Sequence, residues 1–326
     1  MKKHKVKIPG KIIKIPYLTI KGKEKGKTCV ISGGVHGNEI NGIALVKKIL
    51  EHCKKNKIEK RLIGELIIFP ILNNSGFERH KRFVHYDNKD LNRSYNRNTT
   101  TASNLIANSL EKQFYSKADI AIDCHDSGKR SILLPHTRIH KFEDNYCTTC
   151  TREMAKAFGS KIIVERKGKK GMLAIEMTKK YKLPVLTVEV GGALEIKEKY
   201  INQSLDGIIN ILISQGFIPG EVKIPKKQYY LQDRFGIPAK EAGIVMFEKK
   251  LGQRVHLGDK IGKIYVPSKG KTKDLYSPMC GLIFSLQHVD SVIKGEIMYS
   301  ILEDKKCHRK RRTTTDKFEE IININM

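Results

Sequence analysis

The stretch "KTCVISGGVHGNEINGIALVKKILEHC" (residues 27–53) decides the fold, because it joins an apolar run, a glycine-rich turn and a helical pattern. The apolar run at 27–34 predicts a buried strand, and the apolar positions after the turn recur with helical spacing over 39–53. His36 and Glu39 lie between the two. A strand followed directly by a helix is the repeating unit of α/β proteins.

The same unit recurs as far as residue 215. Apolar strands that alternate with helical patterns predict a sheet that is mostly parallel and covered by helices on both faces. We predict further strands at 64–72, 118–125, 161–165 and 183–192, and further helices at 102–115, 144–158, 172–181 and 203–215.

The pattern changes after "GFIPG" (216–220). Short β-rich segments then alternate with Gly, Pro and Asp turns, and no helical period separates them. We therefore expect an α/β domain over 1–219 and a smaller, barrel-sandwich-like all-β domain over 220–304. The run "KKCHRKRR" (305–312) predicts a basic tail over 305–326.

Composition narrows the class of protein. The net charge of +28 favours anionic partners, but the lysines are spread along the whole chain and accompany no nucleic-acid motif, so we disfavour a nucleic-acid face. No apolar stretch approaches the roughly 18 residues that span a bilayer, and the N-terminal segment lacks the apolar core of a signal peptide. Seven cysteines without a secretion signal indicate reduced thiols, and we expect a cytoplasmic protein.

Polar side chains follow two of the predicted strands. His36 and Glu39 come after the first strand, and His125 ends another in "AIDCH" (121–125). Ligands of open α/β sheets bind beyond the carboxyl ends of the strands. Two histidines and one carboxylate are the ligand set of a catalytic zinc site whose fourth position is left to water. The turn thus predicts two metal ligands from one loop.

A third strand end and a long loop supply further candidates. Glu189 ends the apolar strand at 183–192, where burial would raise its proton affinity and suit it to general base work. The polar loop 73–98 offers Arg82, Asn92 and Arg93 as donors to a carboxylate, and long loops in compact domains usually bind something. A structural pairing of Glu189 with a lysine, and surface roles for the arginines, remain open.

Four motifs in this order carry a family resemblance: "GGVHGNE" (33–39), "KDLNRSY" (89–95), "DCHDSG" (123–128) and "TVEVGG" (187–192). Together they resemble the succinylglutamate desuccinylase and aspartoacylase family of zinc-dependent amidohydrolases, which are relatives of the zinc carboxypeptidases. The resemblance covers about residues 27 to 302. It implies a zinc carboxypeptidase-like, three-layer α/β/α domain with a mostly parallel central sheet, followed by that family's second, β-rich domain.

The resemblance also implies roles for named residues. His36, Glu39 and His125 would hold one Zn²⁺ per chain, and Glu189 would be the general base. Asn92, Arg93 and Arg82 would hold the carboxylate of the substrate and polarise its carbonyl. The chain departs from many relatives around the second ligand turn, where Cys124 precedes His125 and Asp126-Ser127 follows it. That departure leaves the acyl group of the substrate open.

The resulting hypothesis is a cytoplasmic zinc hydrolase that cleaves the amide bond of an N-acyl amino acid or a related small anionic amide. A metallocarboxypeptidase that acts on peptides is the nearest alternative, since it would use the same metal and base. A basic nucleic-acid-binding protein with a vestigial site is a more distant one, and it predicts steeply salt-dependent binding. We expect no membrane partner, and the sequence leaves a homo-oligomer open.

Overall fold

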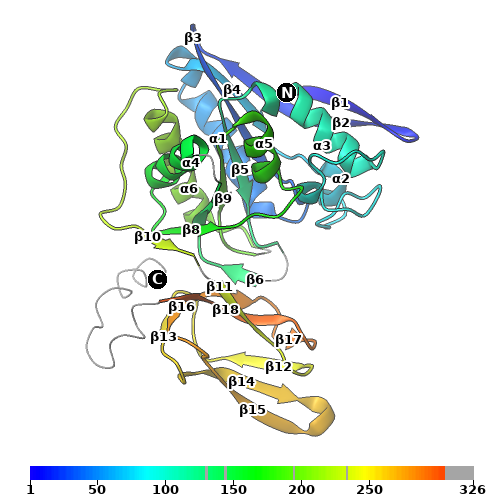
Figure 1. Ribbon diagram of the computed structural model, residues 1–326, viewed down its shortest axis with the longest axis vertical. Helices are drawn as coiled ribbons and strands as arrows, with labels where there is room; N and C mark the ends of the chain where they lie inside the picture. Colours follow the sequence, from blue (N-terminus) through cyan, green and yellow to red (C-terminus); the bar gives the residue numbers. More distant parts are fainter. Residues whose placement is uncertain (129–130, 143–144, 194, 233, 305–326) are drawn as a thin grey trace. The chain divides into compact units, whose positions relative to one another are not determined.

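The computed structural model describes residues 1–128, 131–142, 145–193, 195–232 and 234–304 (Figure 1). The basic tail predicted at 305–326 lies outside these residues. The chain divides into two compact units. Unit 1 consists of Met1–Gly128 and Pro135–Tyr230, and the described part of unit 2 consists of 131–134 and the residues from Leu231 to position 304.

Unit 1 is a mixed α/β fold, as predicted. Its strands are β1 (Lys2–Ile8), β2 (Lys11–Lys21), β3 (Glu24–Gly33), β4 (Ile63–Phe69), β5 (Ile120–His125), β7 (His136–His140), β8 (Ile162–Arg166), β9 (Val185–Glu189) and β10 (Tyr229–Leu231). Its α-helices are α1 (Ile40–Lys55), α2 (Asn74–Phe77), α3 (Ala102–Gln113), α4 (Asn145–Phe158), α5 (Leu173–Tyr181) and α6 (Glu198–Ser214), with 3₁₀ turns η1 (Ile58–Lys60), η2 (Leu91–Arg93) and η3 (Tyr115–Lys117).

The nine strands form one sheet in the order β1-β2-β4-β3-β5-β9-β7-β8-β10. The four central strands β4, β3, β5 and β9 run parallel, as expected from their apolar sequences. The sheet as a whole is mixed, because β2 runs antiparallel to β4 and β7 runs antiparallel to β9. β1, β2 and β7 were not predicted, because their Lys, Pro, His and Arg residues interrupt any apolar run.

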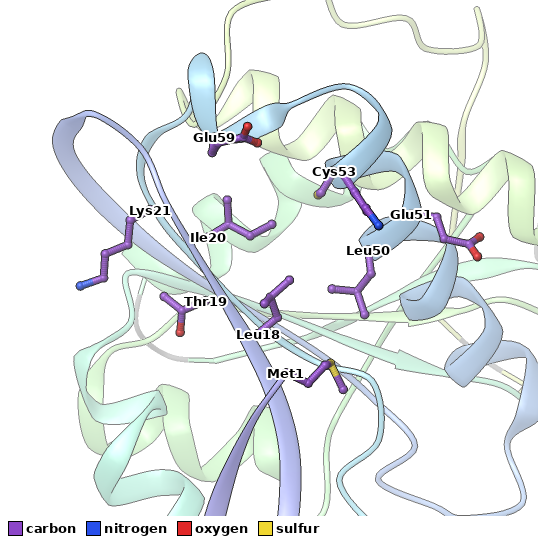
Figure 2. A pocket seen from close by; sticks show the side chains of 10 residues that line it. Met1, Leu18, Thr19, Ile20, Lys21, Leu50, Glu51, Cys53 and Glu59 are labelled. Atoms are coloured by element: carbon purple, nitrogen blue, oxygen red, sulfur yellow. The ribbon is translucent and has the colours of Figure 1, made fainter.

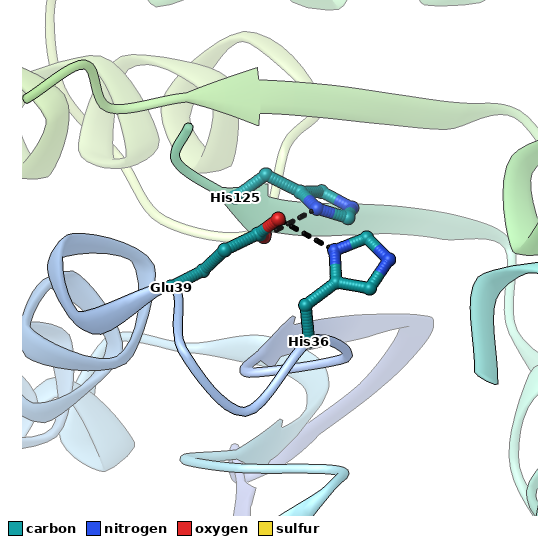
Figure 3. A group of neighbouring side chains, drawn as sticks. All are labelled: His36, Glu39 and His125. Carbon is teal, nitrogen blue, oxygen red and sulfur yellow. Dashed lines mark hydrogen bonds and ion pairs between the residues drawn. The ribbon is translucent and has the colours of Figure 1, made fainter. Parts of the chain in front are cut away.

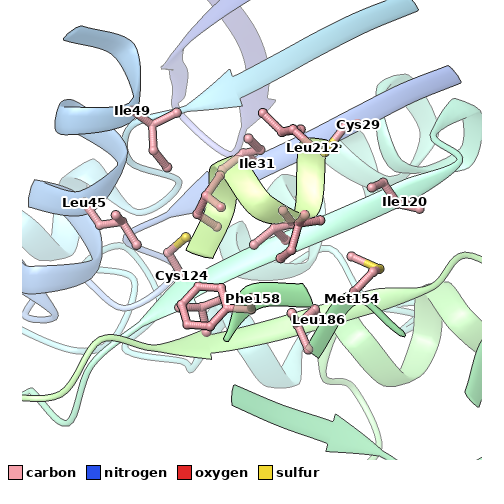
Figure 4. Packing of buried hydrophobic residues seen from close by; sticks show 14 of the residues in the cluster. Cys29, Ile31, Leu45, Ile49, Ile120, Cys124, Met154, Phe158, Leu186 and Leu212 are labelled. Atoms are coloured by element: carbon pink, nitrogen blue, oxygen red, sulfur yellow. The ribbon is translucent and has the colours of Figure 1, made fainter. Parts of the chain in front are cut away.

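Two hydrophobic cores lie on opposite faces of this sheet. Cys29 and Ile31 of β3 enter the first core, whereas Val30 between them enters the second, because successive strand residues point to opposite faces. Helices α1, α4 and α6 supply the first core, part of which is drawn in Figure 4, and α3 and α5 supply the second. The helices therefore pack on the sheet from both sides.

Unit 2 contains strands and one 3₁₀ turn among its described residues. They are β6 (Ser131–Leu133), β11 (Arg234–Pro238), β12 (Gly243–Phe247), β13 (Arg254–Val255), β14 (Lys260–Val266), η4 (Pro267–Lys269), β15 (Lys271–Tyr276), β16 (Gly281–Gln287), β17 (Ser291–Val292) and β18 (Ile297–Glu303). One sheet has the order β11-β18-β16-β13 with β6 on β16, and the other has the order β15-β14-β12-β17. A core around Ile261, Ile283 and Tyr299 lies within the unit.

The strand β6 belongs to unit 2 although its residues precede β7 of unit 1. It pairs antiparallel with β16, with Leu133 opposite Ser285. Sequence analysis assigned 131–134 to the α/β domain because they lie far from the β-rich segment along the chain. Three residues carry no periodicity that would have indicated another unit.

A shallow apolar hollow of about 530 Å³ lies on unit 1 beside β2 and α1 (Figure 2). Leu18, Ile20 and Leu50 line it, together with lysine and glutamate side chains, and its lining includes no histidine and no arginine. The residues that the sequence analysis singled out lie elsewhere. Within the described part of the chain, no helix is both long and apolar enough to cross a membrane.

Candidate metal and catalytic site

The first two candidate ligands lie in the turn that joins β3 to α1. Gly34 has φ +60, which side chains with a Cβ rarely adopt, and this bend lets the chain leave β3 toward the helix. Glu39 occupies the N-cap position of α1, but its side chain makes no capping hydrogen bond. His125 is the last residue of β5, which lies beside β3 in the sheet. The local structure thus leaves the carboxylate of Glu39 free to turn toward His125.

His36, Glu39 and His125 meet at one point (Figure 3). Each residue offers one ligand atom, and these atoms all lie within 4.8 Å of one another. The carboxylate of Glu39 lies between the two rings, with Oε1 2.6 Å from Nδ1 of His36 and Oε2 2.8 Å from Nδ1 of His125. All three side chains are buried. Two imidazole nitrogens and a carboxylate oxygen in one buried cluster fit the coordination preferences of Zn²⁺.

The outer nitrogen of each histidine also contacts a carboxylate. Nε2 of His125 lies 2.7 Å from Oδ2 of Asp123, and Nε2 of His36 lies 3.0 Å from Oδ1 of Asp90. The Ser32 hydroxyl donates to the other oxygen of Asp123 at 3.0 Å. Metal-ligating histidines usually have such a carboxylate behind them, which fixes the orientation of the ring and raises its basicity.

The roles of Asp90 and Asp123 were not predicted, although both lie in the family motifs at 89–95 and 123–128. Asp123 precedes His125 by two strand positions, so both side chains point to the same face of β5. That spacing was a usable signal. The position of Asp90 behind His36 follows from the folding of the loop 73–98, and no local pattern indicates it.

The charges in the cluster support one another. Burial opposes ionisation of Glu39, but the two neighbouring histidines hold its pKa well below its usual range. Burial likewise opposes a charge on His125, yet Asp123 and Glu39 raise its pKa well above the ordinary value. The carboxylates around His125 thus favour positive charge at this point, and a metal cation bound there would displace the proton from the ring, since a ligating imidazole is neutral.

Two contacts hold α1 against the strand that carries His125. A Cβ atom on Gly42 would lie 2.7 Å from the carbonyl oxygen of Cys124, so only glycine allows this approach. The carboxylate of Asp126 accepts a hydrogen bond of 2.7 Å from the backbone N–H of Asn41, in the first turn of α1. Burial, reinforced by the charge of Glu39, raises the pKa of Asp126 to about 8.

Cys124, Asp126 and Ser127, at which this chain departs from many relatives, all make contacts within the fold. Cys124 lies in the first hydrophobic core, and the Ser127 hydroxyl donates to the carbonyl of Gly192. Together with Asp126, which holds the first turn of α1, they attach the second ligand turn to its surroundings.

The loop 73–98 brings Arg82 to the cluster. Its Nη1 donates to Oε1 of Glu39 at 3.1 Å, and its Nη2 donates to Oδ2 of Asp90 at 3.1 Å. Asp90 also begins η2, since its carboxylate accepts a hydrogen bond of 2.8 Å from the amide of Asn92. The side chain of Arg82 keeps 38% of its surface exposed, so its guanidinium is accessible at the edge of the cluster.

Asn92 and Arg93 lie on η2 at the same side of unit 1. Asn92 is buried, and its carboxamide oxygen accepts a hydrogen bond of 2.9 Å from the amide of Leu173 at the start of α5. Its amide nitrogen can donate to a ligand. The guanidinium of Arg93 is half-buried, and burial lowers its pKa against the opposing charge of Asp90.

Glu189 ends β9 directly opposite His125 in the parallel register of β5 and β9. Its Oε1 accepts a hydrogen bond from Nη2 of Arg138, on the neighbouring strand β7. The expected rise in proton affinity is wrong: burial alone would raise the pKa of Glu189, but Arg138 and then His125 lower it overall. Sequence analysis missed Arg138 because β7 is short and polar.

The candidate ligands and Glu189 therefore lie at the carboxyl-terminal ends of β3, β5 and β9, and Asn92 and Arg93 lie on the neighbouring turn η2, which Asp90 begins. His36, Glu39, His125 and Arg82 are in direct contact through Glu39. Arg93 is not in direct contact with Glu39, but the charges of Asp90, Arg82 and Arg138 all shift the pKa of its guanidinium.

Comparison with known proteins identifies one family. The model of the succinylglutamate desuccinylase/aspartoacylase catalytic domain matches residues 25–214. The N-alpha-acetyl-L-2,4-diaminobutyric acid deacetylase of Halomonas elongata is 25% identical over 260 residues, which cover 78% of this chain and 74% of the relative.

Solved structures show the same fold. A succinylglutamate desuccinylase from Silicibacter sp. TM1040 is 22% identical with a TM-score of 0.80, and the product-bound ectoine utilization protein from Ruegeria pomeroyi is 23% identical with a TM-score of 0.81. Each alignment covers 90% of both chains. The resemblance carried by the four sequence motifs is confirmed, and the chain belongs to the succinylglutamate desuccinylase/aspartoacylase family.

Proposed function

We propose that this protein is a zinc-dependent deacylase that hydrolyses the amide bond of an N-acyl amino acid or a related small anionic amide. The observation that carries the proposal is the buried convergence of His36, Glu39 and His125, whose ligand atoms lie within 4.8 Å of one another. The deacetylase from Halomonas elongata and the desuccinylase among the similar structures support the reaction class.

His36, Glu39 and His125 would hold one zinc ion, with Asp90 and Asp123 orienting the two rings. When bound, zinc supplies a Lewis acid that polarises a carbonyl and activates water at neutral pH. Glu189 would take the proton of the attacking water and hand it to the leaving amine.

The cationic side chains would position the substrate. Arg93 and the amide nitrogen of Asn92 would dock its carboxylate, since guanidinium and amide donors suit that group. Arg82 lies against Glu39 and is therefore the arginine closest to the ligands, where it would stabilise the developing oxyanion.

The proposal also covers organisation and location. We assign the hydrolase chemistry to a zinc carboxypeptidase-like, three-layer arrangement of unit 1 and a separate barrel-sandwich-like fold to unit 2. A cytoplasmic location is consistent with the six cysteines among the described residues, none of which forms a disulfide.

The test begins with metal content. Purified wild type should hold about one zinc per chain, His36→Ala should lose it, and His85→Ala, which removes an exposed histidine of the nearby loop, should keep it. Release of amine is then measured from a panel of N-acetyl, N-succinyl and other N-acyl amino acids. Glu189→Gln should retain zinc and lose about 10²–10⁴-fold in kcat.

Three results would contradict the proposal. They are a wild-type protein that binds no zinc when zinc is supplied, a Glu189→Gln variant with normal turnover, and faster cleavage of longer peptides than of N-acyl amino acids. The last result would favour a carboxypeptidase.

A further inference from the structure

Arg138 is a charged residue inside the central sheet, next to the proposed base. It lies on β7 opposite Thr187 of β9, and its Nη2 donates to Oε1 of Glu189. Both partners are largely buried: 13% of the Arg138 side chain and 6% of the Glu189 side chain are exposed. The ion pair therefore engages one carboxylate oxygen of Glu189.

The guanidinium of Arg138 is only partly satisfied. Its Nε is buried and has no hydrogen-bond partner among the described residues. The N–H groups on Nε and Nη2 point in the same direction along one edge of a guanidinium, and together they match the two oxygens of a carboxylate. Glu189 accepts from Nη2 alone. The Nε–Nη2 edge therefore matches a carboxylate that accepts from both nitrogens, whereas Glu189 accepts only from Nη2.

The surroundings favour an anion at this edge. The charges of Arg82 and of Arg138 both lower the pKa of the Arg93 guanidinium, so each of these two arginines lies near Arg93. Asp90 is shared by Arg82 and Arg93, and Glu189 faces Arg138. A carboxylate offers one oxygen each to Nε and Nη2 of Arg138, whereas a neutral carboxamide offers a single oxygen beside an amide group that is itself a donor.

We propose that Arg138 is an exchange residue: it pairs with Glu189 and, when substrate binds, transfers its Nε–Nη2 edge to a second anionic group on the amino acid part of the substrate. This inference rests on the proposed deacylase function. The exchange breaks the hydrogen bond between Nη2 and Oε1 of Glu189 and forms two hydrogen bonds to the substrate anion. Glu189 then has both oxygens available to accept the proton of the attacking water.

The proposal assigns Arg138 a positioning role for the base as well as a specificity role. The anionic group that satisfies Arg138 is the same group that releases Glu189. A substrate without that group would leave the ion pair closed, and its kcat as well as its KM would suffer.

The kinetic test uses zinc-loaded enzyme and a matched pair of substrates, N-acylglutamate and N-acylglutamine, with the acyl group that wild type cleaves best. We expect wild type to prefer the glutamate substrate by at least tenfold in kcat/KM. In Arg138→Gln this ratio should fall to within about threefold of unity, mainly through loss of kcat on the glutamate substrate. Arg138→Lys, which keeps the charge without the two-donor edge, should recover only part of the preference.

Arg152→Gln is the matched control. Arg152 donates from Nη2 to the buried carboxylate of Glu165 at 2.8 Å, so the variant also breaks an arginine–glutamate pair, but away from the site. It should leave the substrate ratio unchanged. If Arg138→Gln lowers the rates for both substrates equally, or if wild type does not distinguish them, the exchange role is refuted.

A binding measurement separates this inference from the proposed function. Free L-glutamate and L-glutamine are titrated calorimetrically into zinc-loaded wild type and Arg138→Gln. Tighter binding of glutamate by at least tenfold, lost in the variant, would support the role of Arg138 even if no N-acyl amino acid were hydrolysed. Equal binding of the two amino acids by wild type would refute it even if the enzyme proved to be a deacylase.

Discussion

Asp123 lies behind the candidate ligand His125, and replacing it tests the metal centre without removing a ligand. Its Oδ2 lies 2.7 Å from Nε2 of His125, and its Oδ1 accepts from the Ser32 hydroxyl at 3.0 Å. Asparagine keeps the shape and can still serve both partners, because its oxygen accepts from His125 and its amide donates to Ser32. The substitution Asp123→Asn therefore removes the charge and little else.

The expected effect follows from the difference between two kinds of hydrogen bond. A bond to a charged group contributes about 1.5–3 kcal/mol, and a neutral one contributes about 0.5–1.5 kcal/mol. The loss of about 1–1.5 kcal/mol corresponds to roughly a tenfold weaker zinc affinity. Asp123→Ala leaves both partners unpaired in a buried place, and we expect a loss of about 100-fold, the upper end for residues behind a metal ligand.

The assay is competition for zinc against a chelator of known affinity, with apo-protein unfolding measured in parallel. Asp119→Asn is the control, since this exposed carboxylate accepts from the amide of Thr28 at 2.7 Å and lies outside the cluster. Zinc binding by folded Asp123→Ala that stays within threefold of wild type would refute the reasoning, because Asp123 would then contribute nothing to His125 as a ligand.

Three further predictions concern the framework and its pH dependence. Gly42→Ala should lower the free energy of unfolding in urea by about 1–3 kcal/mol, because the new Cβ would lie 2.7 Å from the carbonyl oxygen of Cys124. The resulting displacement of α1 would move Glu39 and weaken zinc binding. Unchanged stability would contradict this contact. Leu186→Ala removes a fully buried side chain of β9 and should cost about 2–5 kcal/mol, whereas Ile12→Ala at an exposed position should change stability far less. Burial lowers the pKa of His4 in the folded protein below its ordinary value of 6.5. As pH falls, the unfolded chain therefore takes up a proton at a higher pH than the folded protein does, and the free energy of unfolding should fall below about pH 6.5. His4→Gln, which retains a partner for Ser109, should flatten that fall between pH 7.5 and 5, and parallel curves for both proteins would show that His4 is not responsible.

The central part of the fold was predictable because its strands and helices carry strong periodicity. The strand at 27–34 and the helix at 39–53 correspond to β3 and α1 within a few residues, because their apolar positions face continuous cores. Strands with polar sequences were not predictable in this way. β7 reads "HTRIH", yet it lies inside the sheet, since pairing with β8 and β9 satisfies its backbone.

The candidate ligands were predictable because His36 and Glu39 share one turn and His125 ends a strong strand. Their partners depended on tertiary structure. The environment of Glu189 was misjudged, because a buried carboxylate in an apolar strand predicts a raised pKa only when no cation faces it. Arg138 comes from a neighbouring strand far away in the sequence, and only the pairing of β7 with β9 places it there.

The strand β6 makes the chain leave unit 1 just after the second ligand turn and return at β7. During synthesis, residues 131–133 emerge from the ribosome long before their partner β16, so this strand of the five-stranded sheet pairs late. Pairings between such distant segments close slowly, because the loop entropy is lost before the contacts form. A gene fragment that starts after α6 would encode a sheet that lacks one of its strands. Shuffling this β-rich unit onto another enzyme would accordingly require transplanting two separate segments of coding sequence.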